Sequence, residues 1–480
     1  MIILENLENA NNCFVSGKDL FMKKKAALHN LGCKVNSYET EAMQQLLEEN
    51  GYEIVSFEDT ADVYIINTCT VTNIADRKSR QMLHRARKMN PDAVVVAAGC
   101  YVQARGQEVL EDGAVDMIIG NNQKNQLIPM LDGWFEAKKA EAAVAGETAD
   151  GEAEELHEFV PSALLDLTRV TEYENMNICK TAEHTRAFLK VQDGCNQFCS
   201  YCIIPYARGR IRSRHLKEVQ AEVRGLAAAG YREIVLTGIH LSSYGLDFGT
   251  EEKTPEAPFG HGLQKLILAL AEIDGIERIR LGSLEPRIIT REFVEALAGC
   301  GKICPHFHLS LQSGCDSVLK RMNRHYTTEE YLNKCQLLRE GFKQPAITTD
   351  VIVGFPGETE EEFAATKAFV EQVHFYEMHV FPYSRRQGTV ADRMPNQVPE
   401  TVKKERSHQM LALAESMSQE YQDGFVGQEV SVLLEEPGED GYMVGYTKEY
   451  IRVQKAGGPE LAGQQVYGKI ACRNGKYILE

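Results

Sequence analysis

Twice along the chain, short runs rich in β-branched residues alternate with segments of helical periodicity. In the first block, strands are expected at 25–31, 62–67, 93–98 and 115–119, with helices over 36–50 and 74–89. Continuous apolar runs separated by helices are typical of parallel strands covered on both faces. The first block therefore predicts a doubly wound parallel α/β domain.

The second block repeats the alternation six times. Its strands are expected at 188–192, 233–237, 278–282, 306–311, 347–353 and 377–381, and its helices at 216–229, 263–273, 291–298, 328–340 and 360–373. Six β/α units predict an open, TIM-like barrel rather than the closed form with eight units. Functional residues are then expected just after the carboxyl ends of the strands.

The last part of the chain changes pattern from about residue 424. Five short alternating segments separated by Gly and Pro turns predict a small antiparallel β-barrel of the oligonucleotide-binding type. Residues 136–158 hold eight acids, two lysines and few large apolar side chains, which is typical of a solvated linker. The predicted organisation is an N-terminal extension (1–21), the first α/β domain (22–134), an acidic linker (135–180), the barrel (181–417) and the small barrel (418–480).

The formal net charge of −17 argues against indiscriminate binding of nucleic acid. Basic clusters at 77–88 and 208–217 nevertheless leave room for RNA binding through one focused patch. No apolar run approaches the ~18 residues of a membrane span, and the first residues do not resemble a secretory signal. We therefore expect a cytoplasmic protein without membrane contact, whose 13 cysteines are reduced thiols.

The sharpest motif is Cys195-Asn-Gln-Phe-Cys199-Ser-Tyr-Cys202, directly after the first strand of the barrel. A structural zinc site is one interpretation, but zinc in such sites takes four protein ligands. Three thiolates in one loop suit a 4Fe–4S cluster that has one iron free of protein ligands. A free iron can chelate the amino and carboxylate groups of a small molecule such as S-adenosylmethionine.

This loop, with the aromatic Tyr201 before its last cysteine, resembles the radical S-adenosylmethionine superfamily. The resemblance implies that Tyr201 lies near the adenine of the cofactor and that the turn Thr237-Gly238 meets its methionine amino group. It also implies three weaker candidates for nucleoside contact at later strand ends, Ser283, Gln312 and Val353. For these residues, packing at the end of a strand is an equally good interpretation. The glycine turn lacks the acidic residue that is usual in the family.

A second set of cysteines is spread over the first block. Cys33, Cys69 and Cys100 each follow one of its predicted strands. Neighbouring strands lie about 4.8 Å apart, so thiols at their carboxyl ends meet at one crevice. From the residues alone, a second cluster and three buried structural cysteines are both open interpretations.

The segments LGCKVN, NTC, GC and DGCNQFCSYCIIPYARGRIRSR, followed by the small terminal barrel, together resemble the methylthiotransferases. The resemblance covers residues 23–480 apart from the acidic linker, and it implies that the small barrel is a so-called TRAM domain. It also implies that Cys33, Cys69 and Cys100 hold a second 4Fe–4S cluster. LGCKVN and the sequence around Cys195 look most like the branch that acts on threonylcarbamoyladenosine beside the tRNA anticodon.

The resemblance implies a radical reaction at C2 of that adenosine, at position 37 of the tRNA. The cluster on Cys195, Cys199 and Cys202 would cleave S-adenosylmethionine, and the second cluster would hold a sulfur that a second S-adenosylmethionine methylates. No side chain is expected to act as a general acid or base. An external electron donor and a sulfur donor are implied as further partners. Alternative substrates are isopentenyladenosine in tRNA and an aspartate of a ribosomal protein, and the non-enzymatic alternative is an RNA-binding iron–sulfur protein.

Candidate RNA contacts come from two charged segments. Arg208, Arg210, Arg212 and Arg214 alternate, so an extended chain would place four guanidiniums on one side, where they suit RNA phosphates or cofactor. Lys78 belongs to the basic helix over 74–89. A solvated surface is the ordinary interpretation of both segments. Tyr442, Tyr446, Tyr450 and Lys448 of the small barrel are further candidates for stacking on RNA.

Overall fold

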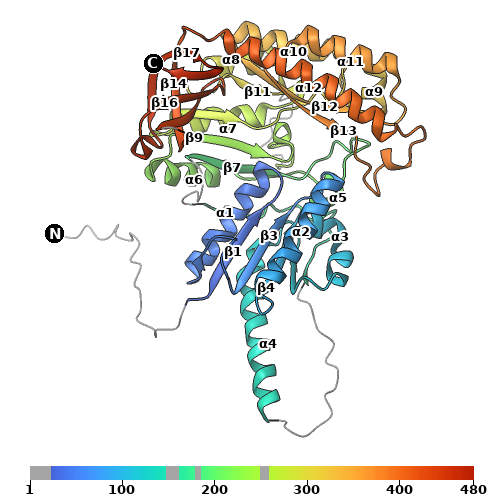
Figure 1. The fold of residues 1–480 in the computed structure, drawn as a ribbon, viewed down its shortest axis with the longest axis vertical. Coiled ribbons are helices and arrows are strands. Elements are labelled where there is room, and N and C mark those ends of the chain that lie inside the picture. Colours follow the sequence, from blue (N-terminus) through green and yellow to red (C-terminus); the bar gives the residue numbers. More distant parts are fainter. Residues whose placement is uncertain (1–22, 148–161, 179–184, 249–258, 440) are drawn as a thin grey trace, which may run out of the picture.

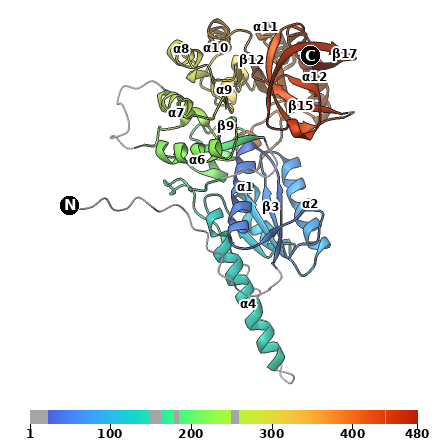
Figure 2. The same ribbon diagram turned by 90° about the vertical axis from the view of Figure 1, so that its left-hand side faces the viewer.

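The computed structural model describes residues 23–147, 162–178, 185–248, 259–439 and 441–480. The predicted extension and the middle of the acidic linker lie outside these residues. The chain forms a lower α/β layer, an upper barrel and a small barrel at the side of the upper one (Figures 1 and 2). No helix among the described residues has the length and apolar character needed to cross a membrane.

The N-terminal domain is built on a parallel sheet of six strands in the order β2-β1-β3-β4-β5-β6. The strands are β1 (Lys25–Asn30), β2 (Glu53–Ile54), β3 (Val63–Thr68), β4 (Val94–Gly99), β5 (Met117–Ile119) and β6 (Ser162–Ala163). The helices are α1 (Lys34–Glu49), α2 (Asn73–Met89), α3 (Cys100–Glu111) and α4 (Leu127–Glu147). Every residue of β3 and β4 is buried, as the continuous apolar runs predict.

Only part of the predicted linker has the character expected of it. Its first residues continue α4, which projects away from the domain (Figure 1). Residues 162–178 return to the protein, because β6 pairs with β5 and the side chains of Met176 and Ile178 enter the main hydrophobic core. The acidic composition that distinguishes 136–158 therefore does not extend over this packed segment.

The central domain is the predicted open barrel. Its parallel strands are β7 (Arg186–Asp193), β9 (Glu233–Gly238), β10 (Arg278–Leu281), β11 (His306–His308), β12 (Ala346–Val353) and β13 (Glu377–Pro382). Short β8 (Arg212–Ser213) pairs antiparallel with β7. The helices include α5 (Ile204–Arg208), α6 (Leu216–Ala228), α7 (His261–Ala271), α8 (Arg291–Ala298), α9 (Asp316–Arg321), α10 (Thr328–Gly341), α11 (Glu360–Val373) and α12 (Glu400–Asp423). The strands form two sheets, β10-β9-β7-β8 and β11-β12-β13, joined only by isolated bridges such as Ile279 to Ile303.

The C-terminal strands close into a barrel of five in the order β14-β15-β16-β18-β17. They are β14 (Glu429–Pro437), β15 (Tyr442–Thr447), β16 (Arg452–Ala456), β17 (Gln465–Arg473) and β18 (Lys476–Leu479). Its core holds alternating side chains such as Val432, Leu434 and Val453. This closed barrel confirms the fold class expected for the end of the chain.

Candidate functional site

The three cysteines of the N-terminal domain lie together at one edge of its sheet. Cys33, Cys69 and Cys100 follow β1, β3 and β4, which are neighbours in the sheet. Gly32 has a φ of +108°, and a Cβ there would lie 2.8 Å from the Cys69 sulfur. Burial, together with the nearby Cys100 and Cys33 thiols, raises the pKa of the Cys69 thiol to about 12. The arrangement has the convergence that the sequence predicts for this set.

Arg208 connects this site to the central domain. Its Nε donates to the sulfur of Cys100 at 3.2 Å, and its Nη1 contacts Glu39 at 2.6 Å and Asp193 at 3.2 Å. Its Nη2 donates to Asn36 at 2.7 Å. Since Glu39 comes from α1 and Asp193 from the end of β7, one buried guanidinium holds both domains against the cysteine site.

The charges around that guanidinium do not balance. Glu39 also contacts Lys124 at 3.0 Å and Lys190 at 2.7 Å, and Asp193 contacts Lys190 at 2.6 Å and Arg212 at 3.7 Å. Four buried cations therefore share these two carboxylates, and one further buried carboxylate, Glu174, lies near Lys124 and Lys190. An unbalanced buried charge is costly, so this network fits an anionic neighbour. Three thiolates binding an iron–sulfur cluster are such a neighbour, and the residues present therefore fit that group.

The expected row of four guanidiniums on one exposed side is wrong. Arg208 ends helix α5 and Arg212 lies in β8, so the run bends instead of staying extended. The side chains of Arg208, Arg212 and Arg214 are buried, and Arg214 pairs with Glu222. These three have no access to RNA phosphates in this structure. Arg210 is exposed, with its guanidinium 4.8 Å from the Phe198 ring.

The cysteine loop of the central domain is fixed by local backbone geometry. Gly194 precedes it with a φ of +71°, and a Cβ there would lie 1.8 Å from the Arg210 carbonyl oxygen, so only glycine fits. The Cys202 amide donates to the Cys199 carbonyl at 2.9 Å, which folds the three thiols into one turn. Arg324 donates to the Cys199 sulfur at 3.3 Å. The loop thus presents three thiols and a cation, as an anionic cluster requires.

A cavity of about 260 Å³ lies between the two cysteine sites. Tyr201 and Cys202 line it on one side, and Val71 and Thr72, just after Cys69, line it on the other. Its remaining wall comes from the ends of the later barrel strands and their loops, through Gln312, Asp350, Ile352 and residues 381–384. A small group held in this cavity would lie beside both cysteine sets.

The predicted cofactor residues fall in three kinds of surroundings. Tyr201 and Gln312 line the cavity, whereas Ser283 is exposed after β10. Thr237 and Val353 are buried, and Val353 packs in the core, so it could offer a ligand only its backbone. Gly238 ends β9, where a Cβ would lie 2.9 Å from Gln192 Oε1.

The glycine turn has a polar arrangement that its sequence does not reveal. Gln192 Oε1 accepts from the His240 amide at 2.7 Å, and Gln192 Nε2 donates to the carbonyls of Asp193 and Gly194. Burial, with Arg324 and Arg287 nearby, lowers the pKa of His240 to about 4. His240 is therefore a neutral ring at neutral pH.

Several contacts of the cysteine sites were missed by sequence reasoning. Asn121 Nδ2 lies 3.5 Å from the Cys100 sulfur, and Arg386 donates to Thr70 at 2.6 Å and to Asp76 at 2.8 Å beside Cys69. Arg324, which reaches Cys199, lies far from the loop in sequence. The one sequence signal for such a supporting residue is a position close to the cysteine loop 195–202 along the chain. Of the residues that support the two sites, only Arg208 has such a position.

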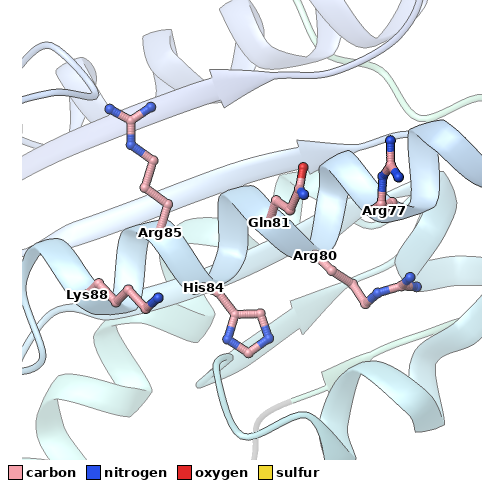
Figure 3. Close-up of a pocket in the computed structure, with 6 residues that line it drawn as sticks. All are labelled: Arg77, Arg80, Gln81, His84, Arg85 and Lys88. Atoms are coloured by element: carbon pink, nitrogen blue, oxygen red, sulfur yellow. The ribbon is translucent and has the colours of Figure 1, made fainter.

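The helix α2 carries a basic face. Figure 3 shows Arg77, Arg80, His84, Arg85 and Lys88 around a shallow hollow on α2. Arg80 donates to the Tyr101 hydroxyl at 3.0 Å, His84 lies 2.7 Å from Asp112 and Arg85 pairs with Glu58. Arg77, Lys78 and Lys88 are exposed and take part in no ion pair within the described residues.

Tyr446 and Tyr450 of the small barrel have partners within the protein. Tyr446 and Tyr450 stack on each other with ring centroids 4.7 Å apart, and Tyr450 stacks on His306 at 4.8 Å. Arg186 lies over both tyrosine rings, and Lys448 donates to the Gly301 carbonyl. These side chains therefore attach the small barrel to the central domain instead of offering free rings to RNA.

Two protein-family models match the chain, one in the N-terminal domain and one in the central domain. Residues 25–120 match the family described as uncharacterized protein family UPF0004, and residues 189–370 match the radical SAM superfamily. A threonylcarbamoyladenosine tRNA methylthiotransferase MtaB of Bacillus subtilis is 41% identical over 449 residues, covering 92% of this chain and 93% of that protein. One of Aquifex aeolicus with the same name is 39% identical, covering 91% and 98%.

A second kind of relative is somewhat less similar. A tRNA-2-methylthio-N(6)-dimethylallyladenosine synthase of Pelotomaculum thermopropionicum is 35% identical over 451 residues, covering 92% of this chain and 94% of that protein. Among solved structures, the radical S-adenosylmethionine methyltransferase TsrM of Kitasatospora setae has a TM-score of 0.52 at 17% identity, covering 77% of each chain. At that identity the likeness supports the fold alone.

Proposed function

The chain belongs to the radical S-adenosylmethionine methylthiotransferases, and from this premise we propose that it modifies N6-threonylcarbamoyladenosine in tRNA. The enzyme is a transferase that places a methylthio group on C2 of that base, beside the anticodon at position 37. Its cofactors are 4Fe–4S clusters and S-adenosylmethionine. When bound, these groups supply reductive cleavage of S-adenosylmethionine and a site for an exchangeable sulfur.

One observation supports this proposal above the others: the cavity of about 260 Å³ between the two cysteine sets. Addition of a methylthio group needs a C–H bond of the base to approach the site of radical formation and the site of sulfur delivery. Cys202 and Tyr201 lie on one wall and the residues after Cys69 on the other. A rival RNA-binding protein with structural clusters has no need of such a shared cavity.

We assign each cysteine set to one cluster as part of this proposal. Cys195, Cys199 and Cys202 hold the cluster that binds S-adenosylmethionine, and Cys33, Cys69 and Cys100 hold the second. Three thiolates leave one iron of each cluster without a protein ligand, which is what both tasks require. The cations Arg324 and Arg208 beside the two sets balance the charge of the thiolates.

The protein side chains around the cavity orient ligands and exclude water. Tyr201 and Gln312 line the cavity, which supports their proposed contact with the nucleoside of S-adenosylmethionine. Gly238 lets the methionine end approach the backbone at the end of β9. Thr237, Ser283 and Val353 stay weaker candidates, because two are buried and one lies in the exposed turn after β10.

The tRNA is the macromolecular substrate, and its contacts are part of the proposal. The exposed cations Arg77, Lys78, Lys88 and Arg210 are placed to meet its phosphates. The external electron donor and sulfur donor expected from the sequence remain proposed partners. Because its substrate is tRNA, a cytoplasmic location is also part of the proposal.

Variants of the two cysteine sets test this assignment. Replacing Cys195, Cys199 and Cys202 with Ala should remove about half the iron of the anaerobically reconstituted enzyme and all cleavage of S-adenosylmethionine. Replacing Cys33, Cys69 and Cys100 should remove the other half and all methylthio product, with deoxyadenosine still formed. Iron analysis and nucleoside mass spectrometry of tRNA provide the measurements.

Cys472→Ala is the matched control, because this exposed cysteine belongs to neither set. Its iron content and product should equal those of the wild type. Unchanged iron in the variant that lacks Cys33, Cys69 and Cys100 would refute the second cluster. Methylthio product on dimethylallyladenosine but none on threonylcarbamoyladenosine would replace the proposed substrate with that of the other relatives.

A further inference from the structure

Three polar side chains meet inside the open barrel, on three adjacent strands. His308 ends β11, Asp350 lies in β12 and His379 lies opposite Asp350 in β13. His308 Nε2 is 3.2 Å from Asp350 Oδ2, and the two imidazole rings stack with centroids 5.9 Å apart. The nearest ring nitrogens and carboxylate oxygen of the three all lie within 4.8 Å of one another.

This polar cluster has unused hydrogen-bonding capacity. His308 Nδ1 contacts the Thr348 hydroxyl at 3.0 Å, but its Nε2 is buried without an aligned hydrogen bond within the described residues. His379 is exposed, and Asp350 is half-buried. The buried Nε2 of His308 loses a hydrogen bond to water without gaining an aligned protein partner, so it favours a polar ligand.

Asp350 connects the polar cluster with the cavity described above, because it is one of the residues that line that cavity. Lys34 brings a positive charge close to His306, which lies on the same face of β11 as His308. Burial lowers the pKa of His306, and the nearby charges of Arg280, Lys34 and His308 act in the same direction. Lys34 takes part in no ion pair within the described residues, so its ammonium is available to an anion.

We propose that His308, Asp350, His379 and Lys34 bind the substituent on N6 of the target adenosine and select a polar, anionic one. The inference rests on the proposed function. In adenine, C2 and C6 are separated by N1 alone. A base that presents C2 between the two cysteine sets therefore carries its N6 substituent into the same cavity.

The chemistry of the substituent matches these four residues. A threonylcarbamoyl group has a carboxylate for Lys34, a hydroxyl and a urea N–H that can donate to Asp350, and oxygens that can accept from the histidines. A dimethylallyl group has none of these and would leave the polar groups unpaired. Sites built to hydrogen-bond a ligand reject analogues that lack the polar group far more strongly than apolar pockets reject a change of size.

The test measures initial rates on three anticodon stem-loop RNAs that carry threonylcarbamoyladenosine, dimethylallyladenosine or unmodified adenosine. In His379→Phe, KM for the threonylcarbamoyl RNA should rise about tenfold, and the preference over the dimethylallyl RNA should fall by at least that factor. Lys34→Met should show the same loss of preference. Iron per chain should stay at the wild-type value in His379→Phe, which separates substrate binding from loss of a cluster.

His408→Phe and Lys404→Met on α12 are matched controls, because both positions are exposed and lie outside the cavity lining. They should keep the wild-type preference. An unchanged preference in His379→Phe, with wild-type enzyme active on the threonylcarbamoyl RNA, would overturn the inference alone. Wild-type enzyme inactive on that RNA but active on the dimethylallyl RNA would overturn the proposed function itself.

Two histidines and a carboxylate are also a recognised ligand set for iron or zinc. Metal analysis of the reconstituted wild type decides between the two interpretations. An extra equivalent of metal beyond the two clusters that disappears in both His379→Phe and Asp350→Asn would overturn substrate recognition in favour of a metal site. Equal metal content in wild type and these variants supports the proposal.

Discussion

At the scale of single residues, Arg208 is the side chain that links the N-terminal cysteine site to the central domain. It is buried, bonds to the Cys100 sulfur and pairs with carboxylates of both domains. Removing one partner of a buried ionic network costs about 3–5 kcal/mol, because the remaining charges stay buried. Arg208→Leu should therefore lower the thermal midpoint by many degrees and reduce iron in the N-terminal set, measured by calorimetry and iron analysis.

Arg210→Leu is its control, two residues away and exposed. It should leave the thermal midpoint and iron content unchanged while weakening tRNA binding. Arg208→Lys keeps the charge but loses the planar fork, so an intermediate result is expected. Equal stability of the Arg208→Leu and Arg210→Leu variants would contradict the bridging role.

The same residues show what sequence could and could not predict at this scale. The convergence of Cys33, Cys69 and Cys100 was predictable, because each follows a recognisable strand of one parallel sheet. From the residues alone, their role as ligands was not, since buried structural cysteines fit the same pattern. The role of Arg208 was not predictable either, because alternating charge is equally typical of a solvated strand. Its burial depends on Glu39 and Asp193, which come from two different domains and carry no local signal.

At the scale of elements, α2 connects the cavity with the surface. Thr72 caps its first turn and lines the cavity, and the helix then runs 17 residues, or about 25 Å, away from it. Its exposed cations Arg77, Lys78 and Lys88 therefore lie along a path that leads outward from the position of the modified base. This direction suits the phosphates of the anticodon stem.

Replacing Arg77, Lys78 and Lys88 with Gln should weaken tRNA binding and reduce its salt dependence by about one unit of slope for each lost phosphate contact. Stability should not change, because the three side chains are exposed. Binding would be measured by fluorescence anisotropy between 50 and 300 mM salt, on the order of the range over which such contacts are lost. Lys265→Gln and Lys404→Gln on α7 and α12 serve as controls, and equal salt slopes in all variants would exclude α2 as the contact surface.

Elements themselves were largely predictable. The periodicity of the apolar residues located the main strands of the N-terminal and central domains within a few residues, because buried parallel strands have few sequence alternatives. The prediction for β11 was too long: the structure ends it at His308, and Gln312 adopts a φ of +70° beyond it. Tertiary packing determines this left-handed backbone conformation, since Gln312 pairs through an isolated bridge with Val351.

At the scale of the whole molecule, two buried arginines attach the small barrel to the central one. Arg278 donates to the carbonyls of Tyr446 and Ser431 at 3.0 Å each, and Arg280 donates to those of Lys448 and Thr447. Arg278 also donates to the side chains of Gln465 and Ser431. The other four of these six acceptors are backbone carbonyls, which any sequence of the small barrel with the same fold could supply. For that reason the docking was not predictable from the sequence of either partner.

The last prediction follows from this docking. Arg278 and Arg280 also pair with Glu233, at 3.5 and 2.7 Å, and that carboxylate is buried. Replacing both arginines with Met removes six hydrogen bonds to the small barrel and leaves Glu233 without these two cations. The small barrel should then separate from the central domain, and limited proteolysis should cut between α12 and β14 and release it as a fragment.

Arg473→Met in β17 is the control, since its partner Glu480 belongs to the same small barrel and both are exposed. It should resist the protease as the wild type does. Iron content should be retained in the double variant, because neither cysteine set contacts these arginines, whereas methylthiolation of tRNA should fall if the small barrel must be held in place to grip RNA. A double variant that resists the protease and keeps full activity would show that the apolar and aromatic contacts alone fix the barrel.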